Sequence, residues 1–468
     1  MKLNYYSVSL VPLLLACASQ QEAQIRDQWE ERSESRASDH QVASPQPAAS
    51  SNIASKTHDE VLSPNLARYV AMAQEKSPEL EASFERWHGS ISRISRARRL
   101  PDPKLSFGYF IRPVETRVGP QRARVGVSQT FPWPTQLTAG ADAASERARA
   151  QQSQFEALAL EIRRRVVVAY YQLWLIRETR NIHAEHLEVV RSLSTTVLAR
   201  VEIGATTLAD QQQVDLSAAR LEDMLAGMDE DEAAAEARLR AAIGNRELET
   251  FSTDHGPPRA SLPGEDEKML FSAVLAHPKL SAFGHLAASH EEKARAEEAA
   301  GLPSFSVGAD WIITGEARMP DVDGSGNDAV IVGGGISIPL WRGSYSDAAD
   351  AARADASAAR AERVAAEDRA LAELHVAYAE VRDAVRRVEL HRNTLVPQAD
   401  SAYASVLGAY VTGQGTVAQT LLAQKDLLEL RGGLEKARAE YAIAWARLER
   451  VVGRAVQTRL NKEANDKQ

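Results

Sequence analysis

The sequence has 468 residues and a single cysteine, Cys17, which excludes a disulfide, or a metal site built from several cysteines, within one chain. No apolar run approaches the roughly 18 residues that a transmembrane helix requires, and even Leu10–Ala18 is far shorter, so a polytopic helical membrane protein is excluded. The 55 basic residues are outnumbered by 64 acidic ones, which argues against nucleic-acid binding. Prolines are absent between Pro134 and Pro257 and after Pro397, and these gaps permit very long helices.

The N-terminus predicts export from the cytoplasm. Lys2 precedes a short apolar stretch, and Leu14-Leu15-Ala16-Cys17 resembles a bacterial lipobox. Residues 1–17 are therefore expected to be a signal peptide, with lipidation at Cys17. Ordinary cleavage after the small residues Ala16-Cys17-Ala18 is the alternative. Residues 18–62 are rich in Gln, Ser, Ala and Glu, which is typical of a disordered tether.

The remainder of the sequence contains a duplicated unit. Ser77-Pro78-Glu79-Leu80 recurs as His277-Pro278-Lys279-Leu280 at an offset of 200 residues, and Gly204 recurs as Gly413 at an offset of 209. The order of such matches is preserved, which indicates duplication rather than chance. The expected division is a first repeat at 63–250, a linker at 251–266, a second repeat at 267–455 and a C-terminal tail at 456–468.

Each repeat contains a predicted β-hairpin, at about 104–131 and about 304–338. Apolar and polar residues alternate there with the period of two that marks a strand with one apolar face. The runs are long enough to cross a bilayer as tilted strands, and soluble hairpins packed on helices are the alternative. Four strands cannot close a barrel and lipid tolerates no free sheet edge, so the membrane interpretation requires oligomerisation. The charged residues expected to face a lumen are Lys104, Arg122, Arg124 and Asp310.

Long helices are expected to connect the hairpins to two glycine turns. Residues 136–203 contain no helix breaker after Gly140, and apolar residues spaced alternately by four and three run from Ile162 to Val201. The same spacing recurs from Ala370 to Ala409, so both segments predict a coiled-coil seam. Shorter helices are expected at about 65–98, 207–243, 267–300 and 415–452.

This combination resembles the TolC-like outer-membrane efflux proteins. The resemblance rests on the export signal, the duplicated unit, the hairpin pairs and the turn Tyr410-Val411-Thr412-Gly413, and it covers roughly residues 63–455. The junction Phe131-Pro132-Trp133-Pro134 looks like that of heavy-metal export members of the family. A multidrug efflux lipoprotein is the other candidate within the family.

The resemblance implies a mainly α-helical chain with a membrane β-barrel, in which three copies form one tunnel. A twelve-stranded barrel would lie in the outer membrane of a Gram-negative-type bacterium, and a helical barrel would extend into the periplasm. It implies two partners, a periplasmic adaptor and an inner-membrane pump with the RND type as a candidate. They would deliver small molecules or metal ions to a passive exit duct without a cofactor. The alternative is a periplasmic coiled-coil adaptor or scaffold lipoprotein.

Family members often close the tunnel tip with acidic residues and a basic partner just after the glycine turns. Here no acidic residue occurs between Gly413 and Leu422, whereas Asp210 stands at the matching place after Gly204. A weaker or different gate is therefore expected, with Asp210 and Gln419 from adjacent helices as its candidates. The alternative for Asp210 is a solvated helix residue.

Other candidate sites are weaker. His183 and His391 occupy equivalent seam positions, which suits a polar residue that fixes helix register better than a metal site. The segment Asp321–Asp328 resembles part of a calcium loop but lacks its terminal Glu, so an external hairpin loop is expected. The sequence shows no convincing set of nucleophile, base and orienting residue, and no enzyme activity is expected.

Overall fold

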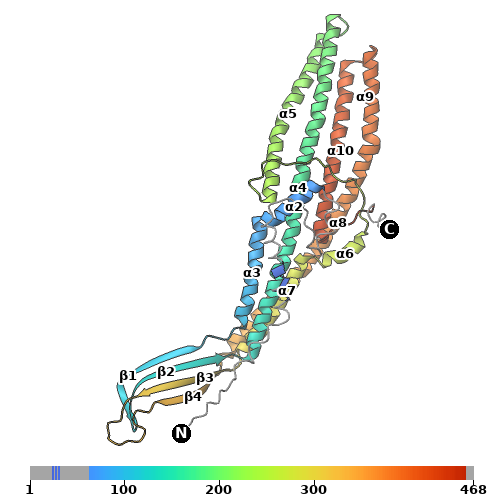
Figure 1. Cartoon of the computed structure of the whole chain (residues 1–468). Coiled ribbons are helices and arrows are strands. Elements are labelled where there is room, and N and C mark those ends of the chain that lie inside the picture. The colour runs from blue at the N-terminus through green and yellow to red at the C-terminus, as the bar shows by residue number, and fades with distance from the viewer. Residues whose placement is uncertain (1–23, 26, 29, 32–62, 460–468) are drawn as a thin grey trace. The chain divides into compact units, whose positions relative to one another are not determined.

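The computed structural model describes residues 24–25, 27–28, 30–31 and 63–459 (Figure 1). The predicted lipidation site Cys17 lies outside the described residues. Within the expected tether, the described residues 24–25, 27–28 and 30–31 are helical. No helix among the described residues is both long and apolar enough to cross a membrane.

The chain forms two compact units. The first is built chiefly from Glu85–Ser153 and Ser281–Val364, and the second contains Gln154–Leu280 and Ala365–Gln468. Each unit draws on both sequence repeats. The duplication is therefore expressed as paired elements within each unit and not as one unit per repeat.

The first unit contains a four-stranded antiparallel sheet in the order β1-β2-β3-β4 (Figure 1). Both predicted hairpins are present, and β2 pairs with β3 to join them. In a single chain β1 and β4 are edge strands. The strands are β1 Lys104–Thr116, β2 Gly119–Phe131, β3 Ser304–Thr314 and β4 Ala329–Ser337.

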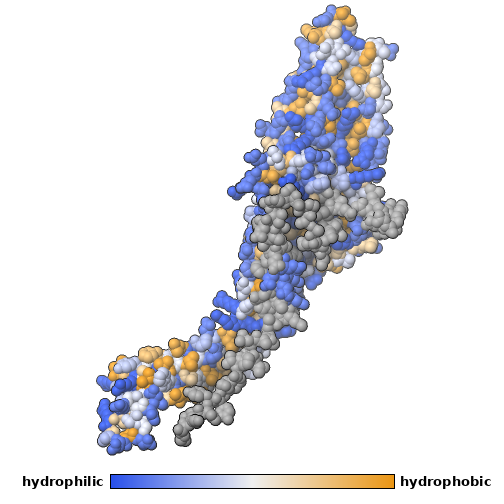
Figure 2. All heavy atoms as spheres, viewed as in Figure 1, coloured by the Kyte–Doolittle hydropathy of each residue, from blue (hydrophilic) through white to orange (hydrophobic). Residues whose placement is uncertain are grey.

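The register gives the sheet one apolar face, as the alternation predicted. Phe107 lies opposite Val125, Val125 opposite Trp311, and Trp311 opposite Val330, so one row of large apolar residues crosses all four strands. Figure 2 shows hydrophobic residues gathered over the strands. Much of this face is exposed in the single chain, with Leu105 at 79% and Val332 at 76%.

The other face carries mainly polar and small residues, with Ile312 and Ile331 as apolar exceptions. Ser106 lies opposite Gly126, Gly126 opposite Asp310, and Asp310 opposite Ile331. We call this the polar face of the sheet. A Cβ atom at Gly126 would lie 2.1 Å from Asp310 Oδ1 and 2.7 Å from Ser106 Oγ, so the charged and hydroxyl groups of this row fit only beside glycine.

Alanine packs the helices of the first unit. Ser289 Oγ donates to the Ala143 carbonyl over 2.8 Å, and His285 Nδ1 lies 2.8 Å from Glu146 Oε2, so α4 (Pro134–Glu202) lies against α7 (Pro278–Ala300). Small side chains allow this close approach. Buried alanines on α4, α7 and α8 (Arg342–Leu390) are Ala139, Ala141, Ala148, Ala150, Ala282, Ala287, Ala294, Ala299, Ala349, Ala352, Ala356 and Ala359.

The first helix of each repeat is interrupted, which the sequence analysis did not predict. Instead of one helix at 65–98, α2 (Pro64–Lys76) ends before Ser77 and α3 (Pro78–Arg98) follows. Likewise α6 (Glu267–Leu275) precedes α7. Pro78 and Pro278 cause both breaks, because proline disfavours the helical conformation of the residue before it and then begins a helix well.

The second long helix is also not uniform. Between α8 and α9 (Val396–Val411), residues His391–Leu395 form a π-helical segment. Pro397 follows, and its missing N–H removes one helical hydrogen bond. His391 packs against Gly433, where a Cβ atom would lie 2.7 Å from the imidazole Cε1. The predicted seam position His391 therefore lies at an irregularity of the helix.

In the second unit the predicted seam is largely buried along α4, and along α8 as far as Val388, whereas the predicted seam positions Gln398, Ala402 and Ser405 on α9 are exposed, so the second seam is wrong there. On α4 the buried seam residues include Ile162, Val166, Leu173, Leu187, Val190 and Val197, and on α8 they include Leu374, Ala377, Val381, Ala384 and Val388. They pack with α5 (Leu208–Ile243) and α10 (Val417–Val452) in two apolar clusters. The long helices thus gain their stability from apolar packing along a seam.

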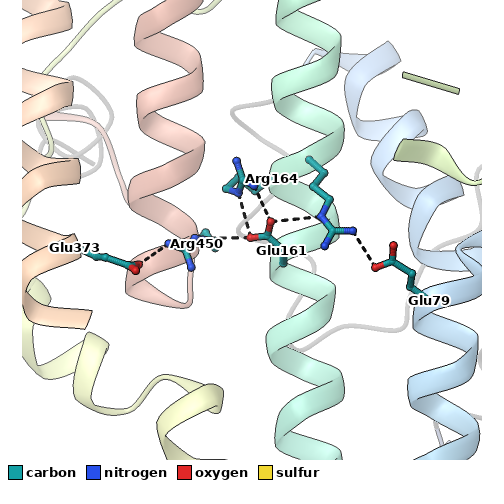
Figure 3. Close-up of polar contacts among 6 residues, drawn as sticks. Glu79, Glu161, Arg164, Glu373 and Arg450 are labelled. Carbon is teal, nitrogen blue, oxygen red and sulfur yellow. Dashed lines mark hydrogen bonds and ion pairs between the residues drawn. The ribbon is translucent and has the colours of Figure 1, made fainter. Parts of the chain in front are cut away.

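A network of ion pairs joins the two repeats inside the second unit (Figure 3). Its centre is Glu161 on α4, which pairs with Arg164 over 2.6 Å and lies 3.8 Å from Arg450 on α10. The network continues through Arg165 to Glu79 over 2.8 Å and through Arg450 to Glu373 over 2.6 Å. Helices from both repeats therefore share one set of charges.

The end of the described chain returns to the linker. Thr458 forms an isolated bridge with Pro263, and Gly264 N donates to the Gln457 carbonyl over 2.8 Å. Arg459 N also donates to the Leu262 carbonyl over 2.8 Å. The first residues of the expected C-terminal tail thus pair with the expected inter-repeat linker.

Candidate functional site

Two glycine turns of the second unit define the first candidate region, which we call the tip. One turn joins α4 to α5 through Gly204, and the other joins α9 to α10 through Gly413. Both glycines have positive φ, 70° and 78°, which other residues rarely adopt. Ala205 N donates to the Arg200 carbonyl, and Gln414 N donates to the Ala409 carbonyl, each over 2.8 Å. The duplicated sequence thus produces the same turn twice.

Asp210 forms a capping box at the start of α5. Its Oδ2 accepts hydrogen bonds from Thr206 Oγ1 at 2.8 Å, Thr207 Oγ1 at 2.7 Å and Thr207 N at 3.1 Å. The Thr207 hydroxyl, the Thr206 hydroxyl and the Thr207 amide, in that order, lower the pKa of Asp210 below its usual value. The side chain therefore stays charged, and one of its two oxygens is used within its own turn.

Gln419 forms the equivalent capping box at the start of α10. Its Oε1 accepts from Thr416 N at 3.1 Å, and Gln419 N donates to Thr416 Oγ1 at 3.2 Å. The spacing Thr207-x-x-Asp210 and Thr416-x-x-Gln419 follows the sequence signature of such boxes. The caps leave Asp210 Oδ1 as an acceptor and Gln419 Nε2 as a donor. Their expected gate role stays a prediction.

Arg200 is the tip residue that the sequence analysis missed. Its Nη1 donates to the Tyr410 carbonyl at 3.1 Å and its Nη2 donates to the Val411 carbonyl at 3.0 Å. The guanidinium carbon also lies 4.5 Å from the centre of the Tyr410 ring. We call this set of contacts the tip clasp, because it holds the end of α9 to α4. No local sequence signal exists for a contact between residues this far apart in the chain.

Buried polar groups continue from the tip into the helices. Gln211 Nε2 donates to Ser194 Oγ at 2.8 Å and to Asp215 Oδ1 at 2.9 Å. Among the buried side-chain atoms of the described residues, Tyr410 Oη and both polar atoms of the Gln424 amide have no hydrogen-bond partner.

The second candidate region is the polar face of the sheet. Arg124 and Asp310, both predicted from the sequence, form a two-bonded ion pair across β2 and β3, with Nε–Oδ1 at 2.9 Å and Nη2–Oδ2 at 2.6 Å. Lys104 lies opposite Ser128 in the register, two residues from Ser106 on the same strand, and so shares this face. The guanidinium of Arg122 lies against Gly315.

The predicted histidine position His183 lies beside His186 on α4. Burial lowers the pKa of His183, and burial together with the nearby His183 lowers the pKa of His186 to about 4. Across residues 63–459 and the few described before them, no group of three or more His, Cys, Asp or Glu side chains could hold a metal ion. The register-fixing interpretation of His183 stays a prediction.

Comparison with known proteins agrees with the expected resemblance. A model of the family described as outer membrane efflux protein matches residues 90–245 and 270–454, well over half of the chain. The chain is 24% identical over 295 residues to the outer membrane efflux protein BepC of Brucella suis biovar 1 (strain 1330). That match spans 63% of this chain and 63% of the length of BepC.

Solved outer-membrane proteins share the fold. VceC from Vibrio cholerae has a TM-score of 0.66 and 19% identity, covering 83% of this chain and 96% of its own. The open state of MtrE from Neisseria gonorrhoeae has a TM-score of 0.66 and 17% identity, covering 84% of this chain and 91% of its own. The family match favours the expected channel class over a periplasmic adaptor. On this evidence of sequence and fold, the chain belongs to the outer membrane efflux protein family.

Proposed function

We propose that the protein is the outer-membrane channel of a tripartite efflux system. The observation that carries this proposal is the exposed apolar face of the sheet, because so large an apolar surface on antiparallel strands is stable only when it is covered. Lipid is the natural cover, since the strands have 9 to 13 residues and the opposite face is polar.

The two edge strands require neighbouring copies, and the family resemblance implies three of them. In lipid, the unpaired backbone groups of β1 and β4 would each cost several kcal/mol per group, so both edges must pair with neighbouring copies. Three copies supply twelve strands, enough to close a barrel around a lumen. Lys104, Arg122, Arg124 and Asp310 would then lie at the wall of that lumen.

Neighbouring residues on opposite faces test the membrane placement. Val332 is on the apolar face and exposed, whereas Gly333 pairs with Gly308 on the polar face and has open space around its Cα. Val332→Arg should prevent stable insertion, because arginine in the lipid-facing band of a barrel costs about 2–4 kcal/mol. Gly333→Arg should insert normally. Equal fractionation of both variants with the membrane would contradict this placement.

The tip is proposed to gate the duct. Asp210 Oδ1 and Gln419 Nε2 are a complementary acceptor and donor, so the two side chains can join helices of neighbouring copies while each still caps its own helix. A hydrogen bond of this kind to one charged partner contributes about 1.5–3 kcal/mol when buried, and less where Asp210 stays exposed to water. The tip clasp at Arg200 would restrain α9 within each copy.

The partners and cargo follow from the same proposal. The duct carries out no chemistry, so an inner-membrane pump, with the RND type as a candidate, would supply the energy and a periplasmic adaptor would join the two. Small molecules or metal ions would be the cargo. Lipidation at Cys17 would add an anchor in the outer membrane, and mass spectrometry of the mature N-terminus tests it.

Planar-bilayer recording tests the channel itself. Purified full-length trimer should produce stepwise conductance, while protein dissociated by heat should produce none. Heat-modifiable bands on a gel identify the folded trimer before recording. Complete absence of conductance from such trimers would overturn the proposed function.

A further inference from the structure

The strands of the sheet carry an excess of basic residues without acidic partners. Six charged residues lie within the four strands, four basic and two acidic. Both acidic residues are already paired within the chain: Asp310 with Arg124 at 2.6 Å and Glu115 with Arg318 at 3.3 Å. In the described part of the chain no ion pair involves the remaining basic residues, Lys104, Arg112 and Arg122.

The ion pair with Arg124 neutralises Asp310, an acidic residue on the polar face. Both guanidinium nitrogens of Arg124 that face Asp310 donate to it, one to each carboxylate oxygen. Gly126 makes the space for this arrangement, since any side chain there would meet Asp310 Oδ1. A carboxylate held in this way attracts a passing cation far less than a free one.

The unpaired cations face small neighbours. Lys104 lies opposite Ser128, and Gly308 and Gly333 continue that row across β3 and β4. Short side chains of this kind cannot neutralise or cover the ammonium group. The ammonium group of Lys104 therefore remains accessible to ions in the space beside the polar face.

We infer that the lumen formed by this face prefers anions, so that small anionic solutes pass more readily than small cations. This inference rests on the proposed channel. Rings of Lys or Arg select anions in pores, as rings of Asp or Glu select cations. One unpaired charge about 10 Å from an ion in water changes the local ion concentration about twofold, before salt screening reduces the effect.

The loop between β3 and β4 provides the internal comparison. Asp321 and Asp323 are exposed there and give the loop negative charge. The loop lies on the β1–β2 turn, where Gly326 N donates to the Val118 carbonyl over 2.8 Å. If the charge of this loop controlled the channel, the channel would prefer cations. The loop and the strands therefore predict opposite ion selectivities.

Reversal potentials of the full-length trimer in a KCl gradient across a planar bilayer decide between them. Wild type should show a chloride-to-potassium permeability ratio of about 2–4, and the double variant Lys104→Gln/Arg122→Gln should lower it toward about 1, with Arg112 still in place. Asp310→Asn should raise the ratio, because it frees Arg124, and Arg124→Gln should lower it. If these two substitutions acted only by disturbing the packing of the sheet, both would change the permeability ratio in the same direction.

Two controls make the result decisive. Asp321→Asn/Asp323→Asn should change the ratio less than the strand variants, and exposed Arg93→Gln on α3 should leave it unchanged. Channels that prefer potassium, or that keep their ratio in Lys104→Gln/Arg122→Gln, would overturn the anion preference and leave the channel proposal intact. Folded trimers without any conductance would overturn the channel proposal and this inference with it.

Discussion

Replacing Arg200 tests whether the tip clasp restrains the channel. Arg200→Ala removes two hydrogen bonds to the carbonyls of Tyr410 and Val411 and one contact with the Tyr410 ring. A hydrogen bond from a charged donor contributes about 1.5–3 kcal/mol when buried, and we take about 1 kcal/mol each because this guanidinium is partly exposed. The ring contact adds about 0.5–1 kcal/mol.

The clasp therefore contributes about 2–3 kcal/mol toward holding α9 against α4 in each copy. Since each 1.4 kcal/mol is a factor of ten, its loss should shift the equilibrium between held and released tips about 30- to 100-fold. Single-channel recording in planar bilayers measures this as the fraction of time spent in the open state. We expect that fraction to rise steeply in Arg200→Ala.

Two matched variants identify the cause. Arg200→Lys keeps the charge but lacks the forked donors that reach both carbonyls, so it should lie between wild type and Arg200→Ala. Arg191→Ala removes an exposed arginine on the same helix, paired with Glu188 and Glu222, and should leave gating unchanged. Arg200→Ala channels with the open fraction of wild type, in trimers of unchanged thermal stability, would refute the role of the clasp.

Three further substitutions test the fold around these sites. Asp210→Ala should lower tip stability by about 1 kcal/mol, measured by hydrogen exchange at the start of α5. Because the pKa of Asp210 is lowered on folding, this stabilisation should be present above its unfolded pKa and disappear as the pH falls through its folded pKa. Gly126→Val should reduce the yield of heat-stable trimer on gels, because a Cβ atom there would lie 2.1 Å from the Asp310 carboxylate. Gly108→Val should leave the yield unchanged, because no atom lies within 4 Å of a Cβ atom at that position. Arg177→Met breaks two ion pairs at 2.6 Å and two hydrogen bonds to the linker, so it should lower the free energy of unfolding by about 3 kcal/mol. The control Arg180→Met removes a more exposed ion pair and should lower it by less than about 1 kcal/mol. Thermal denaturation measures both.

The strands and seams were predictable because their signals are local and periodic. The alternation around Phe107 and Trp311 has the period of a strand, and a register shift of one residue would have moved every apolar side chain to the other face. The seam from Ile162 to Val201 has the period of a coiled coil. In both cases a few neighbouring residues contain the whole pattern, so no knowledge of distant contacts was needed.

Two further features have a local signal in the sequence. Pro78 and Pro278 served to identify the repeat, yet the same prolines also end the helices before them. The spacing Thr416-x-x-Gln419 is a capping-box signature, and Asp210 occupies the same place after Thr207. Gln419 and Asp210 are both gate candidates, with a solvated helix position as the alternative for Asp210, yet the same spacing already predicts their local capping contacts.

The tip clasp belongs to a different class, because its residues have no local signature at all. Arg200 is an ordinary charged residue near the end of α4, and its partners are backbone carbonyls of Tyr410 and Val411. A carbonyl acceptor is present at every position of the chain, so side-chain identity at 410 and 411 cannot reveal which carbonyls are reached. Duplication adds to this difficulty: the place equivalent to Arg200 in the second repeat is Ala409, which has no donor to return the contact. The two copies of the unit therefore share their turns and caps but differ in the contact made by Arg200, which joins them at the tip beside the apolar cluster of Val197 and Tyr410. This asymmetry is the reason we assign the restraint to α4 acting on α9.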